Sequence, residues 1–339
     1  MTSSILMTLQ NHGPVEYRWT HITDEPGFMG RDGVGSLVLN DRMFLIGGWN
    51  PIDPAYYPRH CVNDVWSSGD GLNWRMEKEN TFLEPPFAEA GKDWEGTHTA
   101  GYVVYRDKMW IIGGDPLQGH YQPDVWCSAD GKDWEFVNRG QPVPWHPRTL
   151  HHTFVLDDRI WVLGGQTLPQ FAPAEDVIYH DLWRTQDGLN WEQVEMTKPF
   201  FPARAMYCGS VFYQDRIWLL GGGTYETPAQ PEYVYMNDVW SSGDAVSWER
   251  HTEAAPWQPR VYLNVAVFDD RMWILGGQTP DGNSNDVWYS SDGANWYEVP
   301  DTPWAERHAA STFAYQGALW LMCGSHLQPD VWKLERADC

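Results

Sequence analysis

The feature that most limits what this chain can fold into is a long pattern that recurs from end to end. Each copy contains an apolar strand, a strand ending in Gly-Gly, a loop, a DVW or DLW tripeptide and a turn of the SxDGxxW type. Five copies run from DRMFLIGG to NDVWSSGDGLNW, DKMWIIGGD to PDVWCSADGKDW, DRIWVLGG to HDLWRTQDGLNW, DRIWLLGG to NDVWSSGDAVSW, and DRMWILGG to NDVWYSSDGANW. Such repeats, each with several short strands, are typical of radial all-β folds.

A sixth copy, GALWLMCGSHLQPDVWKLE, stops before its turn and its closing tryptophan strand. The missing strand occurs at the other end of the chain, where Tyr17 and Trp19 in YRWTHIT match the NWRME and DWEFV segments of complete copies. Pairing the termini inside one blade removes exposed sheet edges that favour aggregation. We therefore predict an all-β, six-bladed β-propeller with four antiparallel strands per blade, in which the N-terminal strand completes the last blade.

The same alignment predicts how the chain is divided. The expected parts are an N-terminal extension (1–16), a single propeller (17–336) whose first strand (17–23) closes blade six, and a C-terminal tail (337–339). Of the 22 tryptophans, all but Trp49 recur at fixed repeat positions. Recurrent aromatic positions indicate packing between neighbouring blades, whereas Trp49 is free to contact a ligand.

Charge and cysteine content exclude several classes of function. The chain has 23 Lys and Arg against 46 Asp and Glu, a net charge of −23, which opposes binding to nucleic acid and to anionic membranes. No stretch has the pattern of a signal peptide or a membrane anchor. Its five cysteines form no CxxC pair, which indicates free thiols and predicts a cytoplasmic location.

The doubled glycines, the aromatic residues that flank them and the Pro-Arg lead-ins HPRTLHH and QPRVYLN resemble the kelch superfamily over nearly the whole chain. The resemblance points to propellers like those of the sialic acid mutarotases and the central domain of galactose oxidase. The superfamily also includes nitrile-specifier proteins and protein-binding adaptors. The resemblance therefore implies the fold and leaves the function to be argued from the site.

In kelch-like propellers the ligand usually meets two sets of residues at one mouth of the channel. One set opens each inner strand, and the other follows each Gly-Gly pair. The first set contains a recurrent arginine, which would attract an anionic group or, alternatively, form structural hydrogen bonds between blades. These substrate-binding candidates are Arg31, Arg148, Arg204, Arg260 and Arg307.

Histidines and carboxylates gather in blades six, one and two, which are neighbours once the ring closes. Imidazole and carboxylate groups together suit general acid–base catalysis near neutral pH, and they also suit a divalent metal. A hydrated rim without chemistry fits the same residues. The residues concerned are His308, His326, Asp32, His98 and Asp115.

Five further candidates complete the predicted site. His152 occupies a slot where other blades place small residues, so we expect it to reach the channel and to be a further catalytic residue. Trp49, Gln166 and Gln278 follow Gly-Gly pairs, and Tyr225 belongs to one of three long loops rich in proline and tyrosine. Such loops can wall a pocket for a polyhydroxylated ligand or contact a protein.

These residues lead to the hypothesis of a cytoplasmic enzyme that acts on a small polar, anionic or sugar-like substrate. Histidine and carboxylate would transfer protons, as in an isomerase, a mutarotase or a lyase. Two alternatives stay open: a non-catalytic protein-interaction or ligand-binding propeller, and a metal-dependent enzyme with His and Asp ligands. The sequence identifies no cofactor other than this divalent metal, and it leaves the oligomeric state open.

Overall fold

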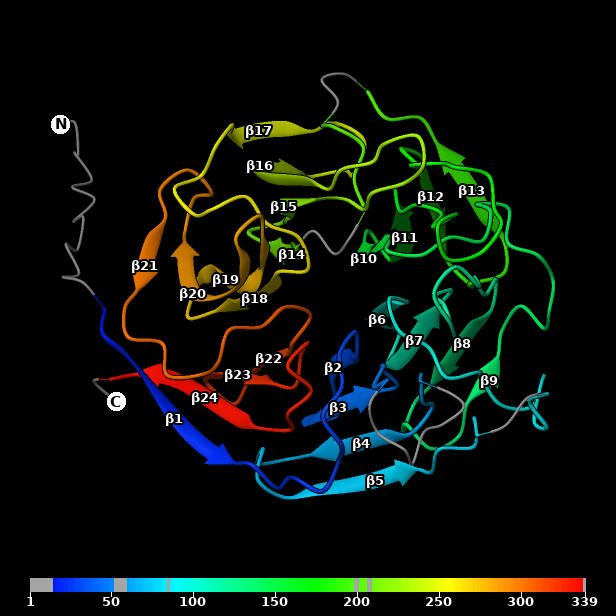
Figure 1. The fold of residues 1–339 in the computed structure, drawn as a ribbon, viewed down its shortest axis with the longest axis horizontal. Coiled ribbons are helices and arrows are strands. Elements are labelled where there is room, and N and C mark those ends of the chain that lie inside the picture. Colours follow the sequence, from blue (N-terminus) through cyan, green and yellow to red (C-terminus); the bar gives the residue numbers. More distant parts are fainter. Residues whose placement is uncertain (1–14, 52–59, 84–85, 198–200, 206–208, 338–339) are drawn as a thin grey trace, which may run out of the picture.

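Six antiparallel sheets of four strands each form a ring in the computed structural model of the chain (Figure 1). The structure describes residues 15–51, 60–83, 86–197, 201–205 and 209–337. Every regular element in this part of the chain is a strand, so it holds no long apolar helix of the kind that spans a bilayer. The predicted all-β, six-bladed propeller is confirmed.

Blades one to three follow one another in chain order, each with its strands paired from the channel outward. Blade one contains β2 (Gly35–Leu39), β3 (Arg42–Ile46), β4 (Val65–Ser68) and β5 (Trp74–Lys78). Blade two contains β6 (Gly101–Tyr105), β7 (Lys108–Ile112), β8 (Val125–Ser128) and β9 (Glu135–Phe136). Blade three contains β10 (His152–Leu156), β11 (Arg159–Leu163), β12 (Leu182–Thr185) and β13 (Trp191–Val194).

Blades four to six continue the ring. Blade four contains β14 (Gly209–Tyr213), β15 (Arg216–Thr224), β16 (Val234–Ser242) and β17 (Glu249–Thr252). Blade five contains β18 (Asn264–Phe268), β19 (Arg271–Thr279), β20 (Gly282–Ser290) and β21 (Tyr297–Val299). Blade six contains β22 (Ser311–Tyr315), β23 (Ala318–Met322), β24 (Val331–Arg336) and, outermost, β1 (Tyr17–Thr23).

The two ends of the chain close the ring within blade six, where β1 lies beside β24 (Figure 1). The two strands are antiparallel, with Trp19 opposite Leu334. The hydroxyl of Tyr17 also donates a hydrogen bond of 2.6 Å to Asp269 in blade five, which ties the closing strand to the neighbouring blade. The predicted completion of the last blade by the N-terminal strand is confirmed.

The hydrophobic core lies between blades. Leu163 of blade three packs with Leu219 of blade four, and Met322 of blade six packs with Leu45 of blade one across the closure. Each fully buried side chain of this kind contributes roughly 1.5–3 kcal/mol to stability. Because every blade covers the apolar faces of its neighbours, closing the ring buries apolar surface that an open ring would expose.

Within each blade an aromatic ring just before the inner strand packs edge-on against the outer-strand tryptophan. The ring centroids are 5.0–5.9 Å apart, a separation at which edge-to-face contacts are favourable. Trp19 of β1 fills the outer position in blade six, as the alignment predicts. The pairs are Phe28 with Trp74, Trp94 with Trp134, Trp145 with Trp191, Phe201 with Trp248, Trp257 with Trp296, and Trp304 with Trp19.

The Gly-Gly corner after the second strand of each blade requires a left-handed backbone. Gly47 has φ 63°, and a Cβ atom there would lie 2.9 Å from the carbonyl oxygen of Thr97. Cys323 holds the equivalent position in blade six with φ 58°, a conformation that costs energy for a side chain with a Cβ atom. The corner therefore keeps its shape even where glycine is absent.

The hairpins that follow this corner differ between blades. In blades four and five the ladder continues past Gly-Gly, so that Thr224 pairs with Val234 and Thr279 pairs with Gly282. Part of the long loop predicted in blade four is therefore strand. These two hairpins stand above one mouth of the channel and carry residues of the candidate site.

Candidate functional site

One mouth of the channel is framed by a ring of backbone bridges. Each bridge joins two positions of one blade. One is the residue directly after the recurrent arginine position, and the other is the residue directly after the Gly-Gly pair. The amides and carbonyls of Asp32 and Trp49 exchange two hydrogen bonds of 2.9 Å. The equivalent bridges join His98 to Asp115, Thr149 to Gln166, Ala205 to Gly223, and Val261 to Gln278. The two residue sets expected to share a mouth therefore do so, and we call this end of the channel the loop mouth.

In blades one, two, three, five and six, the residue two positions after the recurrent arginine position has a left-handed backbone conformation. Thr99, Leu150, Tyr262 and Ala309 have φ values of 48° to 61°, and Gly33 has φ 60°. The turn places Thr99 and Tyr262 on a cavity at the loop mouth. Sequence reasoning missed both residues because it followed only the residue directly after the arginine. The repeat alignment carried the signal, since this turn occurs at the same place in each of these blades.

The cavity at the loop mouth has a volume of about 260 Å³ and combines residues from five blades. It brings together several residues that the sequence singled out, and it also includes Gln118, Tyr262 and Ser325. We call it the mouth cavity. The predicted residues that line it are Asp32, Trp49, His98, Tyr225, Gln278 and His308.

Asp32 presents an unusual carboxylate in the mouth cavity. Burial raises its pKa from 3.8 to about 6, although the nearby His98 opposes the rise. No donor among the described residues forms a hydrogen bond to this carboxylate. Burying a charge without a partner is costly, so a group that supplied the missing contacts would be bound favourably.

His98 and Asp115 form a buried ion pair at the edge of the mouth cavity. The Nδ1 atom of His98 lies 3.0 Å from Oδ1 of Asp115, and the hydroxyl of Thr99 donates a 2.6 Å hydrogen bond to the same oxygen. Burial alone would lower the pKa of His98, but the carboxylate of Asp115 raises it well above its usual range. His98 is therefore a cation whose charge Asp115 balances. Asp115 acts through His98 and does not itself line the mouth cavity.

Cys61 lies beside this pair without forming a nucleophilic triad. Its Sγ atom is 3.8 Å from Nδ1 of His98, the same nitrogen that faces Asp115. A relay needs both ring nitrogens, one for the nucleophile and one for the carboxylate. Burial also raises the pKa of the Cys61 thiol, which keeps it protonated. This arrangement therefore gives no activated thiolate.

His308 approaches the mouth cavity from blade six as a neutral imidazole. Its Nδ1 atom is 2.7 Å from Oδ1 of Asn283, and its ring stacks on Tyr262 with centroids 5.1 Å apart. Burial lowers the pKa of His308 to about 4. The ring is thus uncharged at neutral pH and contributes a flat, polar wall.

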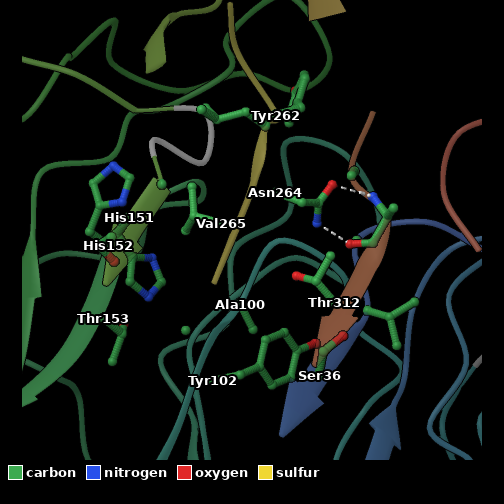
Figure 2. A pocket seen from close by; sticks show the side chains of 18 residues that line it. Ser36, Ala100, Tyr102, His151, His152, Thr153, Tyr262, Asn264, Val265 and Thr312 are labelled. Carbon is green, nitrogen blue, oxygen red and sulfur yellow. Dashed lines mark hydrogen bonds between the residues drawn. The ribbon is translucent and has the colours of Figure 1, made fainter. Parts of the chain in front are cut away.

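His152 lies deeper, in the channel cavity of about 240 Å³ shown in Figure 2. The channel cavity and the mouth cavity share Gly33, Tyr262 and Ala309. Burial, together with the charges of Arg204 and His151, lowers the pKa of His152 to about 3, so it is neutral. The expectation that His152 reaches the channel agrees with its position, but it is not among the residues of the mouth cavity.

The remaining channel wall is rich in hydroxyl groups. The side chains of Ser36, Tyr102 and Thr153 line the channel cavity, as Figure 2 shows. Their hydroxyl oxygens are buried and have no hydrogen-bond partner within the described part of the chain. Such groups are usually satisfied by water, so the channel is a polar passage below the mouth cavity.

His326 does not join the other histidines. Its Nε2 atom lies 3.2 Å from Oδ1 of Asp330, a carboxylate that also pairs with Arg307. His326 is therefore part of the blade-six ion pair and lies outside the mouth cavity. The loop after Cys323 places His326 beside Asp330, a position that the repeat does not specify.

The five recurrent arginines are fully buried rather than presented to the channel. Each guanidinium group pairs with both carboxylate oxygens of the aspartate in the DVW or DLW segment of the same blade. Each also donates to the carbonyl oxygen of the first corner residue. The arrangement favours the structural alternative, because these donors are already used within each blade. The pairs are Arg31 with Asp64, Arg148 with Asp181, Arg204 with Asp238, Arg260 with Asp286, and Arg307 with Asp330.

Gln166 supports the site from below. It is fully buried, and its Oε1 atom accepts a 2.8 Å hydrogen bond from the backbone amide of Tyr225. Gln166 thus positions Tyr225, which lines the mouth cavity, while Gln166 itself does not.

The described residues contain no group of three or more His, Cys, Asp or Glu side chains placed to bind one metal ion. The metal-dependent alternative therefore gains no ligand set from this part of the chain.

Comparison with known proteins gives distant similarities, and no family model matches the chain. Alpha-scruin of Limulus polyphemus is 26% identical over 245 residues, which cover 67% of this chain and 24% of the scruin. Beta-scruin of the same species is 24% identical, and the match covers 83% of this chain and 29% of beta-scruin. The leucine-zipper-like transcriptional regulator 1 homolog of Drosophila melanogaster is also 24% identical, and the match covers 83% of this chain and 28% of that protein. The chain thus spans less than a third of the length of each relative. Together with the six four-stranded blades, these similarities identify the chain as a kelch-repeat β-propeller.

Proposed function

We propose that this propeller is a non-catalytic interaction protein that binds a protein partner over the loop mouth. The observation that carries the proposal is an aromatic surface beside the mouth cavity, formed by Tyr225, Tyr233, Tyr235 and Tyr262. These tyrosines are half-buried and pack on a small apolar cluster around Leu168. Surfaces of this kind are typical of protein interfaces.

The tyrosines are held in place before any partner binds. Tyr225 and Tyr233 have ring centroids 4.8 Å apart, and Tyr233 stacks on Tyr235 at 5.7 Å with an interplanar angle of 16°. Phe171, from blade three, packs edge-on against Tyr225 at 6.0 Å. A rigid aromatic surface loses little conformational entropy on binding, which favours affinity.

The relatives support the same proposal. In the scruins the matched segment is between 24% and 29% of the protein, so there a kelch propeller is one part of a much longer chain. A cytoplasmic location, as the cysteines predict, stays a prediction.

The test is photo-crosslinking from the two ends of the channel. One variant carries p-benzoylphenylalanine in place of Phe171, which is 44% exposed at the loop mouth. The matched control carries it in place of Phe212, which is 50% exposed near the opposite end of blade four. In cells that produce the protein, we expect a discrete protein adduct from position 171 and none from position 212.

Competition shows whether the adduct is specific. An excess of the unmodified propeller should suppress the adduct at position 171, and an excess of the Tyr233→Ala variant should suppress it much less. Equal labelling from both positions, or suppression by both competitors alike, would contradict the proposal.

One observation favours a second candidate, proton-transfer catalysis on a small polar or sugar-like substrate. Asp32 has a pKa of about 6 and shares the mouth cavity with the protonated His98, so an acceptor and a donor face the same space. This candidate is tested by measuring, from NMR spectra, the rate at which the anomers of sugar acids interconvert with and without the purified protein. We expect the protein not to accelerate the interconversion. An acceleration that is abolished by His98→Ala and by His308→Ala would establish the enzyme instead.

A further inference from the structure

The loops that follow the Gly-Gly corners have a one-sided charge. Apart from Arg59, which lies outside the described residues, these loops contain no Lys or Arg in any blade. They do contain acidic residues that form no ion pair with a basic side chain in the described part of the chain, among them Glu175, Asp176, Glu226, Glu232 and Asp281. The loop mouth is therefore acidic, and it attracts cationic groups.

The recurrent arginines do not offset this charge. Each is buried and neutralised by an aspartate of its own blade, as with Arg260 and Asp286 at 2.5 Å. The hairpins at the opposite end of the channel carry both signs of charge, with Arg42, Arg159 and Arg216 beside Asp41, Asp157 and Asp215. The loops that follow the Gly-Gly corners, by contrast, carry almost only acidic charge.

Inside the mouth cavity, Asp32 supplies the one acidic group whose charge is not balanced by a neighbour. His98 is the nearest cation, but Asp115 pairs with it at 3.0 Å. His308 is neutral and the other lining groups carry no charge at neutral pH. An anion entering the mouth cavity would meet a negative site, whereas a cation would complete the hydrogen bonds that Asp32 lacks.

Aromatic rings line the same space. Trp49, Tyr225 and Tyr262 reach the mouth cavity from blades one, four and five. Trp49 stacks on His98 with ring centroids 6.0 Å apart and also lines the mouth cavity. A cation held over such faces gains a further attraction to the ring electrons.

We propose that the mouth cavity takes the ammonium or guanidinium group of a lysine or arginine side chain on a basic segment of a protein partner. This inference rests on the proposed function for the partner being a protein. The volume of about 260 Å³ suits one long side chain, and the acidic loops around it suit the flanking residues. Asp32 is the anchoring group, with Trp49 and Tyr262 as walls.

Short peptides test the inference without a known partner. Isothermal titration calorimetry at pH 7.5 compares Gly-Gly-Lys-Gly-Gly and Gly-Gly-Arg-Gly-Gly with the neutral peptide that has norleucine in the central position. We expect both basic peptides to bind at least about tenfold more tightly than the norleucine peptide, since a charge-assisted contact is lost in the latter.

Variants assign the site. Asp32→Asn should weaken the binding of the basic peptides by about tenfold or more. The matched control, Asp157→Asn, removes an exposed carboxylate at the opposite end of blade three and should leave binding unchanged. Binding should also weaken from pH 7.5 to pH 5 as Asp32 gains a proton, while His98 keeps its charge and His308 stays neutral.

Each outcome decides the inference. The cation site is overturned if the norleucine peptide binds as tightly as the basic peptides, or if Asp32→Asn binds the basic peptides as tightly as the parent protein does. The crosslinking at position 171 tests the proposed function independently of this result. Butylammonium binding as tightly as the lysine peptide would show a site for small amines and overturn the assignment to a protein segment. Loss of binding in both Asp32→Asn and Asp157→Asn would show a diffuse charge effect and overturn it as well.

Discussion

Buried charges in this propeller fall into two groups that differ in their partners. Arg148 and Asp181 form a bidentate pair whose arginine is fully buried, and four other blades repeat it. Blade two has Thr97 in place of the arginine, so its aspartate, Asp124, lacks this partner. Burial raises the pKa of Asp124, as expected for a carboxyl group without a cation beside it.

This difference gives a prediction with its control inside the same chain. Asp181→Asn leaves the buried guanidinium group of Arg148 uncompensated and should lower the free energy of unfolding by about 3–5 kcal/mol. Asp124→Asn removes an unpaired charge and should cost less than about 1 kcal/mol. Urea unfolding followed by tryptophan fluorescence measures both. Equal losses in the two variants would contradict a role for the pair.

We expect the ionised Asp32 carboxylate to lower the stability of the fold while it serves to bind a cation. Its folded pKa of about 6 lies above the ordinary value of 3.8, so ionisation destabilises the fold above pH 6 and does not below about pH 4. Asp32→Asn should therefore raise the free energy of unfolding at pH 7.5 by about 1–3 kcal/mol, with the gain disappearing toward pH 4. Unfolding curves of the variant and the parent protein at each pH give the difference. A variant less stable than the parent at pH 7.5 would show that Asp32 has a partner in the folded protein.

At the level of elements, β1 is the part on which the ring depends. It covers the outer edge of β24, and Trp19 packs on Trp304 with centroids 5.8 Å apart. Removing residues 1–23 should lower the melting temperature and produce oligomers, because the edge of β24 becomes free to pair with another chain. Thermal unfolding and light scattering measure these effects.

A peptide provides the control for this deletion. Residues 15–25 added as a synthetic peptide should restore the melting temperature and the monomer, and the same peptide with Trp19→Ala should restore them less. A truncated chain as stable and monodisperse as the full chain would show that the closing strand is dispensable.

The elements were largely predictable from sequence, since glycine corners, DVW segments and outer tryptophans recur at fixed places. The match of YRWTHIT to the outer strands of complete copies, together with the incomplete sixth copy, was sufficient to assign the closing strand. The long ladder from Thr224 to Val234 was not predicted, because GTYETPAQPEYVYM contains two prolines and shows no alternation. A repeat fixes the blade, whereas the hairpin beyond the corner differs from blade to blade.

The site was only partly predictable, for the same reason. Asp32, His98 and His308 stand at repeat positions, and the structure places all three on one cavity. His326 lies after the corner, where the loop's own path decides its position, and it pairs with Asp330 instead. The arginines recur clearly, but sequence alone could not show that the aspartate of each DVW segment, far along the chain, takes up their charge.

At the scale of the whole molecule, loops with almost no basic residues surround the loop mouth, whereas the hairpins at the opposite end carry both basic and acidic residues. The net charge of −23 gives the protein a negative field, and the loop mouth, with almost no basic residues, concentrates it above the mouth cavity. Such a field speeds the approach of a basic partner and weakens with added salt. Tyrosines on the rim and Asp32 within then provide contacts at short range.

The most direct measurement is a crystal structure of the propeller soaked with Gly-Gly-Lys-Gly-Gly. We expect density for the lysine side chain in the mouth cavity, with its ammonium group within hydrogen-bond distance of the Asp32 carboxylate and next to Trp49 or Tyr262. Density for the peptide only at the opposite end of the channel or on the outer strands, with the mouth cavity filled by solvent, would contradict binding at the loop mouth.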